Sequence, residues 1–422
     1  MSAIRPQNNT PTRMPPQLDR GETDPVSVSD FRQSFGEDLR DVLDIGTWRT
    51  GRDLTQEFPR IEREVKESIE CERQLQARTR TEIFPKLFDP ATSPINGGVY
   101  KANRDILSMV HRGLLLNGGV EACDGTVKVH DTLPLTIFQV GVSLVSYLGD
   151  QGTWHQRLYR RDLRQGGGNP IDEVLEVLAR RSQRAALNHS TDSDLLGVFG
   201  RKTVMDYAER AILLRQSQAV WRMGHGNPIT YELLTGGGIL ELMVAGTTVM
   251  RQLVEEKPKF VFVASEPREL ALLTIGQALP PLHYAIVQTL ADQTRSWFHQ
   301  RRFAVDAGPE LNWDGELIPA AEWIPRFLDR VASKVIVGVF RASPVSPAHL
   351  FYAHADHAHF AAHVALADSL FEEHRGFPLL LRLADHVCTA VFGGSLDYLT
   401  QAAYARAGEP WRYSTERTTR NP

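Results

Sequence analysis

Carboxylates inside apolar segments are the residues of this chain best suited to carry chemistry. Asp124 lies in the run Glu121-Ala122-Cys123-Asp124-Gly125-Thr126, an apolar, β-like stretch. A charged carboxylate in such a place is costly unless it is paired or bound to a metal ion. A metal-dependent phosphodiesterase needs several carboxylates that converge on Mg²⁺ or Mn²⁺, because the metal activates water and neutralises charge on the phosphorus oxygens. Taken alone, residues 124–126 are more simply an acid in a bulge or turn.

A helical segment downstream offers further acids for such a site. Asp206 and Glu209 are three residues apart, so they share one face of a helix, with Arg210 beside them. Asp206 suits the dipole at the helix start, whereas Glu209 has apolar neighbours and is the better ligand candidate. Glu232 precedes the glycines at 236–238, which allow a backbone to approach a ligand closely. No Lys-Ser or Lys-Thr follows these glycines, so they do not form a P-loop.

Five histidines in the last third of the chain form a second candidate cluster. They are His349, His354, His357, His359 and His363. His359 and His363 are four residues apart on an expected helix, a spacing that can bind zinc. Phe360 follows His359, so the HExxH pattern of a metalloprotease is missing. We interpret these histidines as surface or capping residues; a zinc hydrolase would require them to converge in a pocket.

Hydrophobic periodicity predicts an antiparallel meander around Asp124. Two strand-like runs follow it, at 135–148 and 154–163, with turns expected at 131–134 and 149–152. Further helices are expected at 171–187, 202–223, 239–256 and 270–302, short strands at 259–264, 334–341 and 350–354, and closing helices at 357–374, 378–392 and 395–407. Strands with interleaved helices in this order predict an α/β or α+β layer structure.

The composition is that of an ordinary soluble protein, with 42% hydrophobic and 23% charged residues. A formal charge of −4 gives no overall attraction to nucleic acid, so a local patch would have to provide it. The three cysteines are widely spaced, which fits a reducing cytosol and excludes a disulfide framework. The N-terminus lacks the apolar core of a secretory signal, and the longest apolar run is too short to span a bilayer. We therefore expect a cytoplasmic protein that is not bound to a membrane.

The order of segments predicts four parts. These are a disordered N-terminus over 1–28, a helical arm over 29–90, a folded domain over 91–410 and a flexible tail over 411–422. The arm has apolar residues at helical spacing, such as Phe31, Phe35, Ile61 and Val65. It carries more charge than a self-contained core tolerates, so we expect it to pack on something else, for example a second copy of itself.

The C-terminal segment carries a motif that relates the chain to a known family. Residues 375–386, Arg-Gly-Phe-Pro-Leu-Leu-Leu-Arg-Leu-Ala-Asp-His, resemble the closing motif of the NurA family, which is Gly-Tyr-Pro followed by Leu and Ala-His. The run 124–126 resembles that family's first Asp-Gly-Ser motif. The resemblance covers roughly residues 100 to 410 by the order of elements and is specific at these two ends.

The resemblance implies a ribonuclease H-like mixed sheet flanked by helices, here with an N-terminal helical arm. It also implies an Mn²⁺- or Mg²⁺-dependent single-strand endonuclease and 5′ to 3′ exonuclease that acts on DNA in end processing and repair. A homodimer that docks onto a hexameric HerA-type ATPase is implied as well. By position, Asp124 is the first metal ligand and Glu209 the helical acid.

The chain departs from the family pattern near its other motifs. The second Asp-Gly-Ser falls at 236–238, so its Asp is gone, and Glu232 one turn earlier would substitute. The closing motif's Tyr is Phe377. The family's His falls on Asp385, which would be a ligand; alternatively His386, next to it, orients water or phosphate. The expected metal cage is Asp124, Glu209, Glu232 and Asp385, supported by His386. The missing Asp favours a rival hypothesis, an inactive clamp that binds DNA or an ATPase ring.

Overall fold

The structure is a computed structural model of the 422-residue chain. It describes residues 28–48, 54–91, 93–132, 135–160, 195–236, 239–265, 269–300 and 310–412. The N-terminus predicted to be disordered, apart from its last residue, lies outside the described residues. So do the helix predicted at 171–187 and nearly all of the predicted tail. The chain divides into two compact units, Met1–Cys71 and Glu72–Pro422.

The first unit is helical, and none of its described side chains is buried. Its elements are α1 (Val28–Phe35), α2 (Leu39–Leu43), the 3-10 helix η1 (Ile45–Thr47) and the first part of α3 (Leu54–Arg78). Phe58, Ile61, Val65 and Ile69 recur at helical spacing along α3 and are 64%, 55%, 50% and 42% exposed. We call these four residues the arm stripe. A stripe of this kind is the face that a helix buries in an interface.

The second unit is built on a nine-stranded mixed sheet. Its strand order is β1-β7-β10-β11-β6-β5-β2-β3-β4. The strands are β1 (Gly98–Lys101), β2 (Val120–Thr132), β3 (Leu135–Ser146), β4 (Gly149–Arg160), β5 (Trp221–His225), β6 (Phe260–Ala264), β7 (His283–Thr289), β10 (Val335–Arg341) and β11 (Ala348–His354). A separate two-stranded sheet pairs β8 (Glu310–Trp313) with β9 (Glu316–Pro319). The mixed α/β class predicted from the sequence is confirmed.

Around Asp124 the sheet is the predicted antiparallel meander of β2, β3 and β4. Every residue of β3 after Leu135 is buried, which explains its long apolar run. The turn predicted at 149–152 is wrong, because these residues already belong to β4. The register between β3 and β4 shifts beside them, at Leu144/Val145. Gly149 and Gly152 have positive φ angles and belong to the irregular first residues of β4 rather than to a turn.

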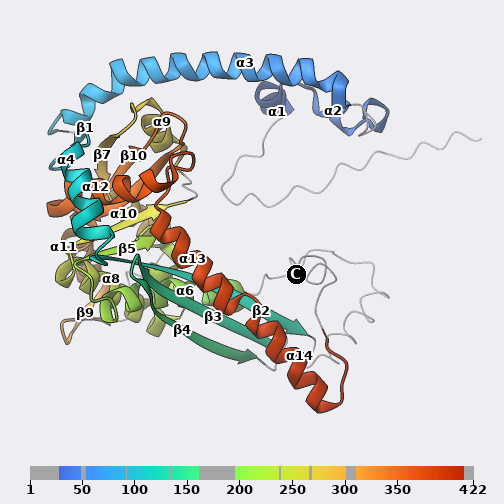
Figure 1. Cartoon of the computed structure of the whole chain (residues 1–422), viewed down its shortest axis with the longest axis vertical. Helices are drawn as coiled ribbons and strands as arrows, with labels where there is room; N and C mark the ends of the chain where they lie inside the picture. The colour runs from blue at the N-terminus through green and yellow to red at the C-terminus, as the bar shows by residue number, and fades with distance from the viewer. Residues whose placement is uncertain are drawn as a thin grey trace, which may run out of the picture. The chain divides into compact units, whose positions relative to one another are not determined.

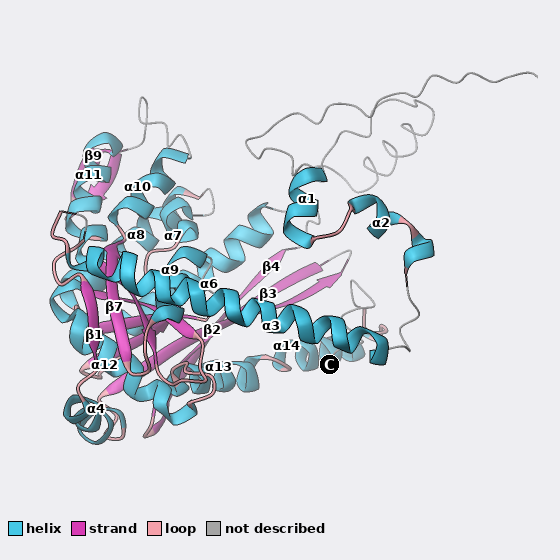
Figure 2. Cartoon of the chain, turned by 90° about the horizontal axis from the view of Figure 1, so that it is seen from above, coloured by secondary structure: helices cyan, strands magenta, loops and turns pink. Residues whose placement is uncertain are grey.

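Helices cover both faces of this sheet, as Figure 1 and Figure 2 show. One face carries α6 (Leu195–Arg215), α7 (Tyr231–Thr235), α8 (Leu240–Glu256), α9 (Leu270–Ala278), α10 (Ala291–Gln300) and α11 (Ala320–Arg330). The other carries α4 (Arg104–Val110), α12 (Ala358–Ser369) and α13 (Leu379–Phe392). Alternate residues of each strand enter the two cores: Cys123 and Val142 face the first, and Ala122 and Val145 the second.

Two strands overlap segments that were predicted to be helical. β5 begins at Trp221, within the segment predicted to be helical through residue 223. β7 lies inside the segment predicted to be helical from 270 to 302. The partners of β5 are β2 and β6, and those of β7 are β1 and β10. These pairings join segments distant in sequence, and such tertiary contacts override local propensity.

One helical stretch among the described residues, Leu379–Ala407, is long and apolar enough to cross a membrane by length and composition alone. It comprises α13 and α14 (Ser395–Ala407). α13 runs along β2 and β3, as Figure 1 shows. Ser143 Oγ on β3 donates to the carbonyl of Ala384, and Gln139 Nε2 donates to that of Phe392. These hydrogen bonds attach α13 to the sheet.

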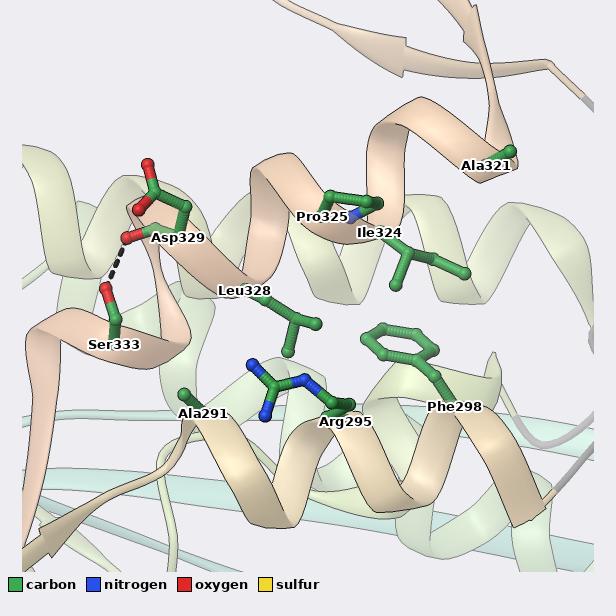
Figure 3. A pocket seen from close by; sticks show the side chains of 9 residues that line it. All are labelled: Ala291, Arg295, Phe298, Ala321, Ile324, Pro325, Leu328, Asp329 and Ser333. Atoms are coloured by element: carbon green, nitrogen blue, oxygen red, sulfur yellow. Dashed lines mark hydrogen bonds between the residues drawn. The ribbon is translucent and has the colours of Figure 1, made fainter. Parts of the chain in front are cut away.

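A surface hollow of about 510 Å³ lies between α10 and α11. Figure 3 shows Phe298, Ile324 and Leu328 pointing into it, with Arg295 at its side. Its lining is mostly apolar and includes none of the predicted site residues.

Candidate active site

Asp124 lies where two parallel strands separate. β2 pairs with β5 up to Cys123↔Gly224, and the next residues along the two strands are Asp124 and His225. The Asp124 carboxylate is 7% exposed, and its Oδ1 lies 3.3 Å from Nδ1 of His225. Oδ1 also accepts a hydrogen bond from the amide of Gly125, at 2.9 Å. The end of the short strand β5 thus places an imidazole directly beside the buried acid.

The His225 ring connects this acid to two distant segments. Its Nε2 lies 2.8 Å from the hydroxyl of Ser265, which directly follows β6. The ring of Phe377 meets the His225 ring edge-on, with centroids 6.1 Å apart. Phe377 belongs to the C-terminal motif that suggested the NurA resemblance. The fold therefore brings that motif to the neighbourhood of Asp124, 253 positions earlier in the sequence.

Glu209 approaches β2 from the α6 side and is 5% exposed. The thiol of Cys123 donates to the Glu209 carbonyl at 3.6 Å, which holds this turn of α6 against the strand. A Cβ atom at Gly125 would lie 2.6 Å from Oε1 of Glu209. Real Cβ contacts are essentially never that short, so Gly125 creates the space in which the Glu209 carboxylate lies against β2, at the residue that follows Asp124.

Arg210 is the most deeply buried charge of the site, at 1% exposure. Its guanidinium donates to Oε2 of Glu209 at 3.0 Å and to the Asp206 carbonyl at 2.9 Å. It also donates to the carbonyls of Asn227 at 2.6 Å and Pro228 at 3.2 Å. A buried charge persists only when it is paired and hydrogen-bonded in this way. Arg210 therefore fixes Glu209 and the loop after β5 in one arrangement.

These neighbours shift the pKa values of the site. Burial raises the pKa of Glu209 to about 8; the positive charge of Arg210 lowers it, and the negative charges of Asp124 and Asp206 raise it. Burial lowers the pKa of His225, but its hydrogen bond to Asp124 and the charges of Asp124 and Glu209 outweigh burial, so the net shift is upward. Two buried acids near each other, with one pKa raised, are a feature of functional sites.

The helical acids other than Glu209 have structural partners. Asp206 Oδ2 accepts from the hydroxyl of Thr230, which caps the N-terminus of α7. Glu232, on α7, pairs with Lys202 on α6. Gly236 is the left-handed C-cap of α7, where a Cβ would lie 2.4 Å from the amide of Met243. The described member of the glycine run thus ends a helix, while residues 237 and 238 lie outside the described residues.

Asp385 and His386 are exposed residues of α13. Thr389 donates to Asp385 at 3.5 Å, a long hydrogen bond. One turn further, burial raises the pKa of the Cys388 thiol to about 12, and the charges of Asp124, Glu209 and Asp385 contribute to the rise. α13 therefore lies within electrostatic range of the two buried acids.

The histidine cluster is used structurally. His363 Nδ1 lies 2.6 Å from the carbonyl of His359, and its Nε2 accepts from the amide of Asn103. His359 Nδ1 contacts the hydroxyl of Tyr284, and His349 Nε2 the carbonyl of Arg375. Both ring nitrogens of His363 are thus engaged. The interpretation of the cluster as surface residues is wrong, because three of the five are buried and none is exposed, whereas His354 does act as a cap, accepting from the amide of Asp356.

A divalent cation fits the donor chemistry beside Asp124. Carboxylate oxygens are the ligands that Mg²⁺ and Mn²⁺ take, and an imidazole nitrogen favours a transition metal. Gly125 leaves room for the second carboxylate, that of Glu209. Across the described part of the chain, no group of three or more His, Cys, Asp or Glu side chains is already gathered in a geometry that could hold a metal. Asp124 and His225 are therefore the two candidate ligands that already lie together, and Arg210 fixes the position of the Glu209 carboxylate.

Comparisons with known proteins bear on the fold. No family model matches the sequence, and no curated protein matches it. The structure is similar to the NurA nuclease from Sulfolobus solfataricus at 11% identity, covering 85% of this chain and 98% of that chain, with a TM-score of 0.41. A NurA structure with manganese has 9% identity, covering 71% and 95%, with a TM-score of 0.34.

Ciona intestinalis endonuclease V, in complex with a 24mer DNA that contains an inosine followed by a ribo-adenosine, is similar at 9% identity. It covers 65% of this chain and 85% of that chain, with a TM-score of 0.27. The resemblance to NurA expected from the sequence is matched by these similarities. They concern the fold alone.

His225 and Arg210 are the site residues that sequence reasoning missed as functional groups. The helix predicted through residue 223 placed His225 in a terminating loop. The signal that could have found it is the short run Trp221-Arg222-Met223 before Gly224, which also suits a strand. Arg210 was visible beside Glu209, but its burial depends on tertiary packing.

Proposed function

We propose that this protein is a metal-dependent DNA nuclease that hydrolyses phosphodiester bonds at the Asp124 site. The observation that carries the proposal is the meeting of two buried acids from separate elements, Asp124 on β2 and Glu209 on α6. The Glu209 carboxylate lies against Gly125, the residue after Asp124, and the charge of Asp124 contributes to the raised pKa of Glu209. Mn²⁺ or Mg²⁺ is the proposed cofactor, because carboxylates are its preferred ligands.

Each residue has a distinct role in this proposal. A bound divalent ion would supply activated water and neutralise charge on the phosphate. Asp124 and Glu209 would hold it, since the Glu209 carboxylate lies against Gly125, the residue after Asp124. Arg210 keeps Glu209 in place through Oε2, and Gly125 keeps Oε1 close to the strand. We further propose single-strand endonuclease and 5′ to 3′ exonuclease activity in DNA end processing, in the cytoplasm, as the NurA resemblance implies.

Metal removal tests the proposal directly. We expect the full-length protein to shorten a labelled single-stranded DNA in Mn²⁺, with no cleavage in EDTA and recovery when Mn²⁺ is restored. The physical reason is that two buried carboxylates without a cation offer no activated water. Gel electrophoresis of the products is the measurement. Cleavage in EDTA at an unchanged rate would contradict a metal-dependent mechanism.

A catalytically inactive clamp is the second candidate. Arg210 gives Glu209 a cationic partner from within the chain, and His225 gives Asp124 a hydrogen-bonding partner, which reduces the need for a metal. Under this alternative the protein binds single-stranded DNA or an ATPase ring and leaves the DNA intact with Mn²⁺ present. Binding measured by fluorescence anisotropy without any product on the gel would favour the clamp over the nuclease.

The proposed assembly is a homodimer that docks onto a hexameric HerA-type ATPase. The arm stripe supports self-association, because its four apolar side chains are 42% to 64% exposed on a helix rich in charge. Apolar faces of this kind mark protein interfaces.

Charges placed in the arm stripe should therefore separate the dimer. We expect the double variant Ile61→Glu/Val65→Glu to raise the dimer dissociation constant at least about tenfold, since each buried aliphatic side chain contributes roughly 1.5–3 kcal/mol. Sedimentation velocity over a concentration series measures it. The control is Cys71→Glu/Gln74→Glu, which adds the same charge on the opposite face of α3 and should leave the dimer unchanged. Equal dissociation of both variants would place the interface elsewhere.

A further inference from the structure

We infer that His225 supplies a nitrogen ligand to the cation beside Asp124, in the place where an all-carboxylate site would have a further acid. The inference rests on the proposed function and names a ligand that was absent from the predicted cage of Asp124, Glu209, Glu232 and Asp385. It follows from strand topology: β5 is the parallel neighbour of β2, and its last residue is His225.

The separation of the two atoms fits a shared metal. Nδ1 of His225 and Oδ1 of Asp124 are 3.3 Å apart. Neighbouring ligands of an octahedral ion with bonds of about 2.1 Å are roughly 3 Å apart, so both atoms can face one cation with little movement. The His225 side chain is 35% exposed, which gives an ion and its waters access to this pair.

The second ring nitrogen of His225 has the hydrogen-bond partner that metal-binding histidines usually have. Nε2 of His225 lies 2.8 Å from Oγ of Ser265. A hydrogen bond at the second ring nitrogen fixes the ring orientation of a ligating histidine and leaves the first nitrogen for the metal. The ring of Phe377 packs edge-on against the same imidazole and limits its rotation. Two segments remote in sequence therefore orient His225 toward Asp124.

A nitrogen ligand has a consequence for metal choice. Mg²⁺ is bound through oxygen ligands, whereas imidazole is a ligand of transition metals. A site made of Asp124, Glu209 and His225 should therefore prefer Mn²⁺ over Mg²⁺, and a third carboxylate in place of His225 should reduce that preference.

The test measures Mn²⁺ binding in the full-length protein, independently of cleavage. Electron paramagnetic resonance of free Mn²⁺ gives the affinity, and electron spin echo modulation detects an imidazole nitrogen on bound Mn²⁺. We expect His225→Ala to weaken Mn²⁺ binding at least about tenfold and Ser265→Ala to weaken it less, since outer partners act through the ligand. His225→Asp should retain Mn²⁺ binding, lose the nitrogen modulation and bind Mg²⁺ more tightly than the wild type.

A matched control separates a ligand from a merely structural histidine. His155 on β4 is exposed, and His155→Ala should keep both the affinity and the nitrogen modulation. If the wild type binds Mn²⁺ without nitrogen modulation, or His225→Asp keeps it, His225 is not a ligand, and the nuclease proposal stands. If the wild type binds no Mn²⁺ at millimolar concentration, the proposed function itself fails, and the inference fails with it.

Discussion

Replacing Asp124 by asparagine will abolish Mn²⁺-dependent cleavage of single-stranded DNA. We expect a fall of about a hundredfold or more in the cleavage rate, which corresponds to roughly 2.7 kcal/mol of transition-state stabilisation. Asparagine has nearly the same shape, and its Oδ1 can still accept the Gly125 amide. What it lacks is the negative charge that a divalent cation requires. The measurement is the initial rate of cleavage at saturating Mn²⁺.

Asp150 provides a matched control for this substitution. It lies on β4 of the same meander, and its Oδ1 also accepts a hydrogen bond from a backbone amide, that of Gly152 at 2.8 Å. Unlike Asp124 it is exposed, and its strand β4 is two positions from β2 in the sheet order. Asp150→Asn should cleave at the wild-type rate. If Asp124→Asn is folded and also cleaves within about threefold of the wild type, the chemistry does not take place at Asp124.

The meander that carries Asp124 could be predicted because its signals are local. β3 is a mostly apolar run, and turn residues lie near both ends of it. Later elements with strong periodicity, such as α8 and β6, were predicted within one residue of their observed limits. In each case the residues that decide the structure are neighbours in the sequence.

The composition of the site could not be predicted in the same way. The proximity of His225 to Asp124 depends on parallel pairing of β5 with β2, two strands separated by nearly 90 residues. The burial of Arg210 depends on carbonyls of the loop at 227–228, contributed after a strand that local propensity did not reveal. Motif alignment made Glu232 a metal ligand in place of the Asp that is missing at Gly236, whereas in the structure Glu232 forms an ion pair with Lys202 and Gly236 caps a helix.

The two acids of the site also differ in how their charge is balanced. Asp124 faces an imidazole that is 35% exposed and can be neutral, with any proton lost to water when a metal binds, whereas Glu209 faces a guanidinium that keeps its charge. A metal can therefore replace the partner of Asp124 more readily than that of Glu209. Arg210 is better understood as the residue that holds Glu209 and its surroundings in place, and its removal should be measured as a loss of stability.

Substitution of Arg210 by methionine should destabilise the protein by about 3–5 kcal/mol, the range for removing one partner of a buried ion pair. The change leaves the Glu209 carboxylate buried without its cation and deprives the carbonyls of Asp206, Asn227 and Pro228 of their donor. It also removes the cation over the Phe262 ring. Guanidinium chloride unfolding followed by tryptophan fluorescence measures the free energy of unfolding.

Two further variants separate the effect of the guanidinium from the effect of removing any arginine of α6. Arg210→Lys retains the charge but has three donors for four acceptors, so it should lose roughly 1–3 kcal/mol and still fold. Arg215→Met, at the exposed end of the same helix, should change stability by less than about 0.5 kcal/mol. If the hydrogen bonds of Arg210 hold Glu209 in place, the loss in free energy of unfolding is smallest for Arg215→Met, larger for Arg210→Lys and largest for Arg210→Met. If the two Arg210 variants unfold at the same denaturant concentration as Arg215→Met, the guanidinium contributes nothing to the fold, and Glu209 must be held by its packing against Gly125 alone.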